Sequence, residues 1–207
     1  MRIITGDARG IKLKTLEGES TRPTGERVKE ALFSMIQFDI EGREALDLFG
    51  GSGQLGLEAL SRGAARAVIL DSSVEAVEII KENAKHTKLF DRCRIAVSDY
   101  AGYLRSAAGR EAFDIIFLDP PYKSDFLPAA LRLISNGGIA KPKAMIVCED
   151  AEGDVFRGSE ELASRYRVLR RVNYGKAWIT LITPAEGGAT ETADADADAD
   201  ADIDTNI

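Results

Sequence analysis

The chain has 207 residues, and its 34 Asp and Glu residues outnumber its 27 Lys and Arg residues, which gives a net charge of −7. An acidic surface repels the phosphates of a nucleic acid, so this balance at first argues against such a partner. The excess is local, however, because the segment from residue 191 onward carries seven acidic side chains and no basic one. Before it, acidic and basic side chains are equal in number, and a nucleic-acid partner is not excluded.

Composition predicts one globular domain over residues 1–187 and an Ala-Asp tail over residues 188–207, which has nothing to bury and which we expect to be disordered. Cys93 and Cys148 form no CxxC pair, so neither a disulfide framework nor a zinc site is expected. The N-terminus lacks a signal-peptide core, and no apolar run approaches the roughly 18 residues of a membrane span. We therefore expect a cytoplasmic monomer that binds no membrane and no metal.

The first 40 residues precede the core of this domain, which is expected over residues 41–187. Residues 1–20 hold two short β-prone runs around the turn-like GDARG and predict a basic β-hairpin extension. Residues 21–40 predict a connecting helix, which Thr24 caps and whose apolar residues recur at helical spacing.

From residue 45 onward, apolar runs typical of buried strands alternate with helical segments. Strands are expected at 45–49, 65–71, 93–99, 112–119 and 144–150, and helices at 55–63, 72–86, 100–107 and 126–134, the second of them opened by a capping box from Ser72 to Glu75. This alternation predicts an α/β fold with a doubly wound, mostly parallel sheet. Within residues 165–183, two strand-like runs flank Tyr174–Lys176 and predict an antiparallel hairpin at the edge of that sheet.

A glycine-rich loop follows the first of these strands. Residues 51–56 (GSGQLG) match GxGxxG, in which glycines let the backbone approach a ligand and the following helix offers free N–H groups. Asp71 lies 20 residues after Gly51, at the end of the next strand, where a carboxylate can accept hydrogen bonds from ribose hydroxyls. The motif by itself fits NAD or another adenosine cofactor, and it also fits a tight turn without a ligand.

Two further aspartates favour one adenosine cofactor. Asp47 precedes the glycine loop by four residues, where its charge would repel a diphosphate but attract a ligand that carries an ammonium and a sulfonium group. S-adenosylmethionine is such a ligand. Asp99 ends the third strand, where it could accept a hydrogen bond from an adenine amino group. A single aspartate at a strand end is usually a helix cap, but three at successive strand ends of one sheet edge predict a binding site.

The segment Asp119-Pro120-Pro121-Tyr122 directly follows the fourth strand. Its prolines remove two N–H donors and leave a rigid turn with outward-facing acceptors. The Asp119 carboxylate and the Pro120 carbonyl could hold both hydrogens of an exocyclic base amine and turn its lone pair toward a methyl donor, while Tyr122 stacks on the base. The turn therefore predicts N-methylation of a nucleobase, although a stiff loop without a ligand would have the same sequence.

Four segments together resemble the RsmD-type 16S rRNA guanine-N2 methyltransferases: RPTGERVKEALFSMI, DLFGGSGQLGLEALSRGA, DPPY and YGKA, all within residues 1–184. The resemblance implies a Rossmann-like class I methyltransferase fold with a seven-stranded sheet. It also implies transfer of a methyl group from S-adenosylmethionine to the N2 amine of one guanine in small-subunit rRNA, either as rRNA or within a precursor of the subunit. Gly50 stands where the family commonly has alanine.

The resemblance implies roles for single residues as well. The glycine loop with Asp47 would hold the methionine part of the cofactor, Asp71 the ribose and Asp99 the adenine. We thus predict three sets of site residues: catalytic Asp119, Pro120 and Tyr122; cofactor-binding Asp47, Phe49, Gly51, Ser52, Gly53, Asp71 and Asp99; and substrate-binding Arg2, Arg9, Lys12, Arg22, Thr24, Arg27, Pro121 and Lys123.

A second basic group lies near the C-terminus, where no acidic residue occurs between residues 162 and 178: Arg165, Arg167, Arg170, Arg171 and Lys176. It fits contact with RNA and equally a solvated edge strand. Other functions remain open from the sequence. The chain could be an adenine-N6 methyltransferase on DNA or RNA, an NAD-dependent oxidoreductase, or a non-catalytic RNA-binding assembly factor with the same fold.

Overall fold

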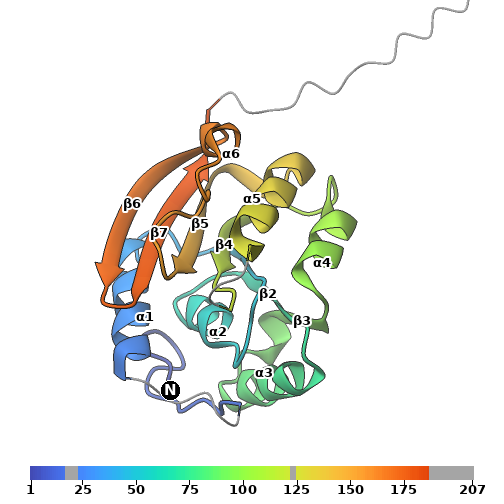
Figure 1. Ribbon diagram of the computed structural model, residues 1–207. Helices are drawn as coiled ribbons and strands as arrows, with labels where there is room; N and C mark the ends of the chain where they lie inside the picture. The colour runs from blue at the N-terminus through green and yellow to red at the C-terminus, as the bar shows by residue number, and fades with distance from the viewer. Residues whose placement is uncertain (17–22, 122–124, 187–207) are drawn as a thin grey trace, which may run out of the picture.

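The computed structural model describes residues 1–16, 23–121 and 125–186, without the side chains of residues 23 and 24. These residues form seven strands: β1 (Glu44–Asp47), β2 (Arg66–Asp71), β3 (Cys93–Val97), β4 (Phe113–Leu118), β5 (Ala140–Asp150), β6 (Tyr166–Tyr174) and β7 (Ala177–Pro184). All seven belong to one twisted sheet with the strand order β3-β2-β1-β4-β5-β7-β6 (Figure 1).

The sheet is parallel from β3 to β5 and antiparallel around β7. In the centre, Leu46 of β1 pairs with Val68 of β2 and Ile116 of β4, so β1 is hydrogen-bonded on both sides. The C-terminal hairpin inserts β7 between β5 and β6, antiparallel to both. The predicted doubly wound sheet with an antiparallel C-terminal hairpin is confirmed.

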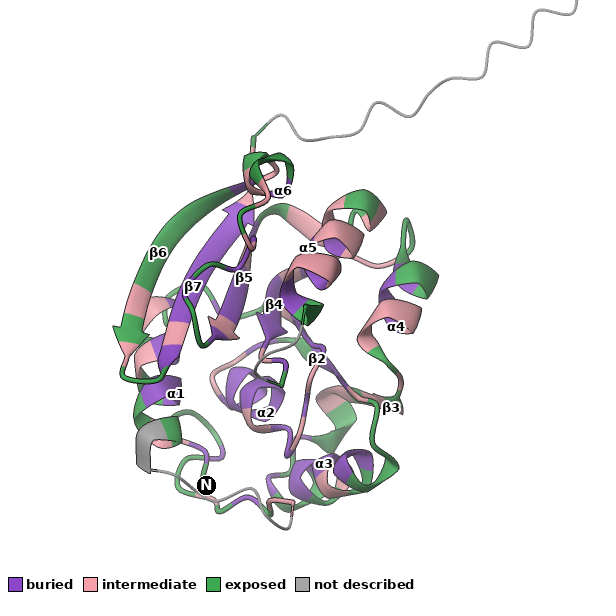
Figure 2. Ribbon diagram, viewed as in Figure 1, coloured by how far each residue is buried: buried purple, intermediate pink, exposed green. Residues whose placement is uncertain are grey.

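Helices cover both faces of the sheet. One face carries α1 (Pro23–Met35), α2 (Gln54–Ser61) and α3 (Val74–His86), and the other carries α4 (Tyr100–Ala107), α5 (Phe126–Gly137) and the short α6 (Glu160–Ser164). A 3₁₀ turn, η1 (Phe90–Arg92), precedes β3. Alternate side chains of β4 enter the two apolar layers, with Phe117 on the first face and Ile116 on the second. The central strands are accordingly buried along their length (Figure 2). Each such side chain contributes about 1.5–3 kcal/mol relative to exposure.

Two helices differ from their predicted starts. The predicted cap residue Thr24 lies inside α1, because the helix already begins at Pro23, a residue suited to a first helical position. The cap of α3 is Ser73 rather than Ser72, because the Ser73 side chain accepts a hydrogen bond from the Ala76 amide. The Ser73 amide in turn donates to the Asp71 carboxylate over 2.8 Å, which fixes the residue before the helix.

Within residues 1–16, the described part of the predicted hairpin, the chain reverses direction as predicted but forms no regular hairpin strands. Its two arms meet in one isolated antiparallel bridge between Arg2 and Lys12. Three further backbone hydrogen bonds join the two arms, among them Ile3 N–H to the Ile11 carbonyl over 3.0 Å. Ile3 and Leu13 are buried in the layer that covers the α1 face of the sheet. The segment therefore packs as part of the core.

Candidate functional site

Four aspartates lie where neighbouring strands end. Asp47 is the last residue of β1 and Asp71 the last of β2, while Asp119 directly follows β4 and Asp99 follows β3 by two residues. Because β3, β2, β1 and β4 are adjacent and parallel, their carboxyl ends lie at one edge of the sheet. The strand order reverses between β1 and β4. The carboxyl ends of the strands at such a reversal are the usual ligand position in open α/β sheets.

The glycine loop between β1 and α2 is held in a conformation that only glycine adopts freely. Gly51 and Gly53 have φ angles of +53° and +80°. The loop lies close to β2, since the Gly50 amide donates to the Leu70 carbonyl over 2.7 Å. A Cβ atom on Gly50 would come within 2.8 Å of the Ile69 side chain, so the alanine common in the family would require this neighbour to move.

Asp47 is buried beneath this loop, with 1% of its surface exposed. Its Oδ2 accepts a hydrogen bond from the Gly56 amide of α2 over 3.1 Å, whereas its Oδ1 has no partner among the described residues. Burial raises the pKa of Asp47 to about 7, an effect that the Gly56 and Phe49 amides only partly offset. A buried carboxylate with one unpartnered oxygen is suited to a cation bearing N–H groups.

The other two cofactor-side aspartates have structural partners. The Asp71 carboxylate accepts from the Gly51 amide over 2.9 Å and from the Ser73 amide, so it joins the glycine loop to the start of α3. Asp99 is exposed and caps α4 by accepting from the Gly102 amide over 2.9 Å. The capping role that a single aspartate usually has is thus present at Asp99, and further oxygen lone pairs of both carboxylates remain for a ligand.

Three aromatic rings, one from the loop after β1 and two from the first residues of α4 and α5, meet at the same edge. Phe49 packs against Tyr100 with ring centroids 5.4 Å apart and against Phe126 at 6.1 Å, and Tyr100 lies 5.2 Å from Phe126. Phe49 was among the predicted residues, but Tyr100 and Phe126 were not. They are the first residues of α4 and α5. The sequence signal that could have identified them is that Tyr100 directly follows Asp99 and that Phe126 comes soon after the 119–122 turn.

The predicted catalytic turn lies next to this aromatic cluster in the chain. Asp119 is half-buried, Pro120 is buried and Pro121 is exposed. Of the remaining predicted residues, Arg22, Tyr122 and Lys123 lie outside the described residues, as does the side chain of Thr24. The edge therefore brings together the described members of the catalytic and cofactor sets.

The described substrate-side residues Arg2, Arg9, Lys12 and Arg27 are all exposed. Arg2 pairs with Glu26 of α1 at 3.7 Å, which sets the N-terminal segment beside α1. The same segment reaches the glycine loop, since the Ser52 hydroxyl donates to the Met1 sulfur over 3.6 Å. These basic side chains are thus carried by elements that adjoin the candidate site.

Buried polar side chains that sequence reasoning missed hold this segment in place. Glu58 of α2 is fully buried, accepts from the Ile4 and Thr5 amides over 2.8 and 3.0 Å, and pairs with Lys29 at 3.4 Å. Asn83 of α3 binds both the amide and the carbonyl of Lys14, and its side chain also donates to the Ser52 carbonyl over 2.8 Å. A charged residue inside the apolar run LGLEALS was the one sequence signal for Glu58.

The described part of the chain holds neither a metal-binding cluster nor a membrane-spanning helix. No group of three or more His, Cys, Asp or Glu side chains there is arranged to hold a metal ion. No helix in that part is both long and apolar enough to cross a membrane.

The strand order, the glycine loop and the aspartates at the carboxyl edge define a Rossmann-like class I methyltransferase fold. The chain belongs to the family described as conserved hypothetical protein 95, whose profile matches residues 1–183, and this confirms the resemblance to the RsmD-type enzymes. YlbH of Bacillus subtilis is 43% identical over 150 residues, which are 72% of this chain and 82% of YlbH.

Two further relatives agree with this assignment. Ribosomal RNA small subunit methyltransferase D of Haemophilus influenzae is 37% identical over 150 residues, covering 72% of this chain and 78% of the relative. The solved structure of the Escherichia coli protein yhhF superposes with a TM-score of 0.76 at 29% identity, covering 89% of this chain and 97% of that protein.

Proposed function

We propose that this chain transfers a methyl group from S-adenosylmethionine to the N2 amine of a guanine in small-subunit rRNA. Membership of the family and the Haemophilus influenzae relative, whose name specifies small-subunit rRNA, support the substrate class. The observation that carries the proposal is Asp47, because a buried carboxylate with an unpartnered oxygen suits a cationic ligand and repels the diphosphate of NAD.

The residues at the sheet edge fit this cofactor. Asp47 Oδ1 would accept from the ammonium group, Asp71 from the ribose hydroxyls and Asp99 from the adenine amine, with Phe49, Ser52 and the glycine loop forming the remainder of the site. When bound, S-adenosylmethionine supplies a methyl group on a sulfonium, which is already a good leaving group. The chain's own task is then to bind, orient and desolvate the acceptor amine.

The 119–122 turn would orient that amine. The Asp119 carboxylate and the Pro120 carbonyl accept its two hydrogens, so the nitrogen lone pair leaves conjugation with the ring and faces the methyl group. Asp119 then accepts the proton that the methylated amine releases. The single histidine of the chain, His86, is exposed at the last position of α3, so a carboxylate rather than an imidazole takes this role.

The identity of the methylated nucleoside tests the reaction. Purified protein incubated with cofactor and small-subunit particles that lack this modification should yield N2-methylguanosine in nucleoside mass spectrometry. N6-methyladenine in place of it would show an adenine-N6 methyltransferase. No incorporation by folded protein would leave a non-catalytic RNA-binding factor, and either result overturns the proposal.

Substitution of the turn tests the catalytic role. Asp119→Ala should lower turnover by about 10²-fold or more, because both the orientation of the amine and the proton acceptor are lost. Cofactor affinity measured by calorimetry should stay unchanged. Asp125→Ala is the matched control, since Asp125 precedes α5 and its side chain makes no capping hydrogen bond. Loss of cofactor binding in Asp119→Ala would remove Asp119 from the catalytic role.

A further inference from the structure

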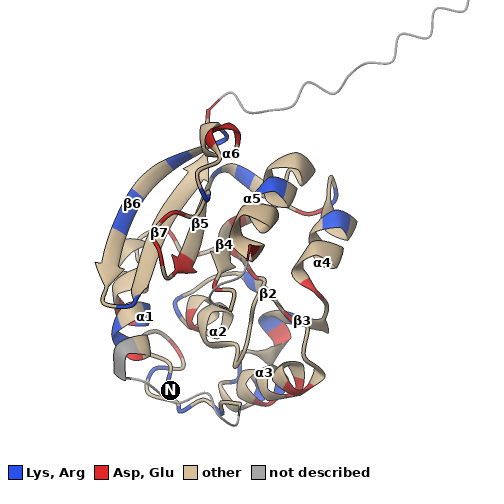
Figure 3. Cartoon of the chain, viewed as in Figure 1, with Lys and Arg blue, Asp and Glu red and all other residues tan. Residues whose placement is uncertain are grey.

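The outer strand β6 carries a line of exposed cations. Arg167, Arg170 and Arg171 are exposed along the strand, Lys176 is exposed in the β6–β7 turn, and Lys143 is exposed near the start of β5. We call these five residues the β6 basic edge. None of them forms an ion pair with another described residue, unlike Arg165 just before the strand, which pairs with Glu161. Figure 3 shows basic segments along β6 with no acidic one among them.

The direction of β6 connects this line to the candidate site. Because β7 is antiparallel to both β5 and β6, β6 runs in the same direction as β5, β4 and β1. The end of β6 and Lys176 therefore lie at the carboxyl edge of the sheet, where Asp47 and Asp119 also lie. In Figure 1 this turn lies beside α1, which carries Arg27. The cations thus lead from the edge that would hold the target base to the opposite edge.

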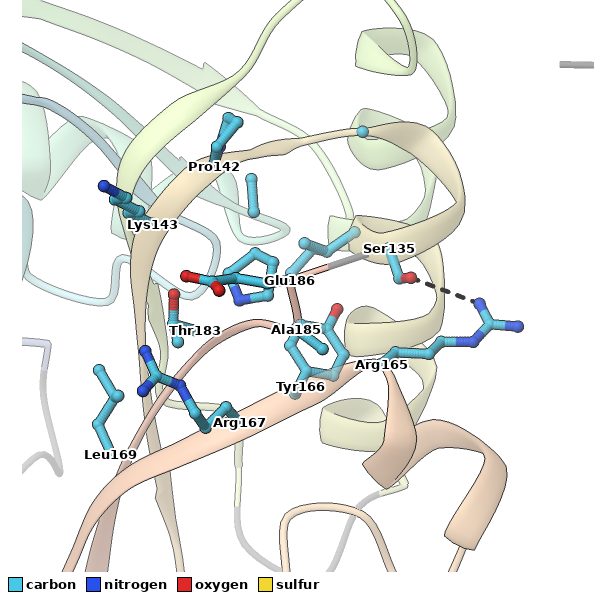
Figure 4. A pocket seen from close by; sticks show the side chains of 14 residues that line it. Ser135, Pro142, Lys143, Arg165, Tyr166, Arg167, Leu169, Thr183, Ala185 and Glu186 are labelled. Carbon is cyan, nitrogen blue, oxygen red and sulfur yellow. Dashed lines mark hydrogen bonds between the residues drawn. The ribbon is translucent and has the colours of Figure 1, made fainter. Parts of the chain in front are cut away.

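A pocket of about 650 Å³ lies at that opposite edge, between the end of α5, the starts of β5 and β6, and the end of β7. Lys143 and Arg167 both line it, with Thr183 and Glu186 between them (Figure 4). Lys143 has a φ angle of +66°, which is strained for a residue with a side chain, and it stands in the part of β5 where the pairing with β4 shifts register. Lys143 of β5 and Arg167 of β6 thus line the same pocket.

We propose that the β6 basic edge is a second rRNA-binding surface, which contacts the phosphodiester backbone of the RNA segment that flanks the target nucleotide. The proposal rests on the proposed function. A strand of nine residues extends about 30 Å, so its cations can contact several successive phosphates. Such contacts set the register and orientation of the RNA without reading its sequence. Charges that only protect an edge strand from pairing would not require Lys143, which lies on another strand.

The test is the salt dependence of RNA binding by the full chain. The variant Arg167→Gln/Arg170→Gln/Arg171→Gln should bind unmodified small-subunit rRNA more weakly, and its slope of log K against log [salt] should fall by about 3, one for each lost phosphate contact. The KM for rRNA should rise while kcat and cofactor affinity stay unchanged. The control Lys85→Gln/Arg105→Gln/Arg110→Gln removes the same charge from exposed residues on and after α3 and α4, which flank the opposite edge strand β3.

Equal slopes for the two triple variants would overturn the proposal, because only net charge would then matter. So would self-association of the β6 variant in sedimentation with an unchanged RNA slope, which would show that the arginines only protect the edge strand. A third contrary result would be an unchanged slope together with faster proteolysis of residues 187–207 in the β6 variant than in the wild type. This would show that the β6 basic edge binds the acidic tail instead of RNA. Because the salt slope is measured without turnover, these results are distinct from failure of the proposed methylation.

Discussion

Burial raises the pKa of Asp47 in the free protein, whereas a bound cationic ligand would lower it. In the free protein, desolvation raises its pKa from 3.8 to about 7, so near neutral pH the side chain is only partly ionised. A bound ammonium group would favour the ionised form. Binding of the cofactor should therefore depend on pH within the physiological range, even though an ordinary aspartate would be fully ionised there.

We expect cofactor affinity to rise between pH 6 and pH 8 as Asp47 becomes ionised. Calorimetric titration with S-adenosylmethionine across this range measures the effect. Asp47→Asn should bind weakly at every pH, because the amide offers no charge. A wild-type affinity that does not change over this range would contradict the assignment of Asp47 to the ammonium group.

The same residue should lower the stability of the unliganded protein as pH rises. The folded-state pKa lies above the unfolded one, so the unfolded state is favoured progressively from about pH 4 to pH 7, by a total on the order of 4 kcal/mol. Asp47→Asn removes this dependence and should unfold at a higher temperature than the wild type at pH 8. The difference should shrink toward pH 4. Thermal unfolding at several pH values, without cofactor, is the measurement.

The aspartates could be predicted from sequence because each ends or follows a strand, and strand ends of a parallel sheet share an edge. Their hydrogen bonds could not. The cap of α3 depends on the Asp71 carboxylate, which holds the Ser73 amide and so moves the cap one residue from Ser72. The ring cluster of Phe49, Tyr100 and Phe126 requires the loop after β1 and the starts of α4 and α5 to meet in space, which no local pattern encodes.

At the scale of elements, the N-terminal segment is fixed by buried polar contacts with α2 rather than by strand pairing. The Glu58 carboxylate accepts hydrogen bonds from two amides of the segment. One of its oxygens also pairs with Lys29, which is 2% exposed. Burial lowers the pKa of Lys29, and the Glu58 carboxylate opposes this shift. Glu58 lies 54 residues after Ile4 and 53 after Thr5 in the sequence, so these hydrogen bonds could not be predicted from local spacing.

Glu58→Ala should lower the free energy of unfolding by about 3–5 kcal/mol, because it leaves two amides unpaired and removes the carboxylate that neutralises the buried Lys29 ammonium group, which keeps the Arg2 carbonyl as a hydrogen-bond acceptor. Denaturant unfolding measures the loss, and hydrogen exchange should show reduced protection of residues 3–13. The control is Glu78→Ala, which removes a surface pair with Lys81 at 2.7 Å and should cost less than about 1 kcal/mol. Similar losses in both variants would show that Glu58 does not anchor the segment.

At the scale of the whole molecule, charge is divided between a balanced domain and an acidic tail. The seven acidic side chains after residue 190 account for the whole net charge of −7. The alternation of apolar runs with helical segments predicted the doubly wound, mostly parallel sheet, since parallel strands need helical crossovers between them. The sequence predicted an antiparallel edge hairpin over residues 165–183, and the structure places β6 as the exposed edge strand of the sheet.

Removal of residues 187–207 should increase affinity for rRNA at low salt, because the acidic tail competes with phosphates for basic side chains. The gain should vanish at high salt, where exposed charges are screened. Filter binding of full-length and shortened protein at two ionic strengths measures this. Equal affinities at low salt would show that the tail takes no part in binding.

The side chain of Asn83 connects two regions that would bind different ligands. One amide group contacts Lys14 in the basic N-terminal segment and the Ser52 carbonyl in the glycine loop. Order imposed on the loop by one ligand therefore lowers the entropic cost of ordering the segment for the other. Thermodynamic linkage makes such an effect reciprocal, so cofactor and RNA would each tighten the binding of the other by the same factor.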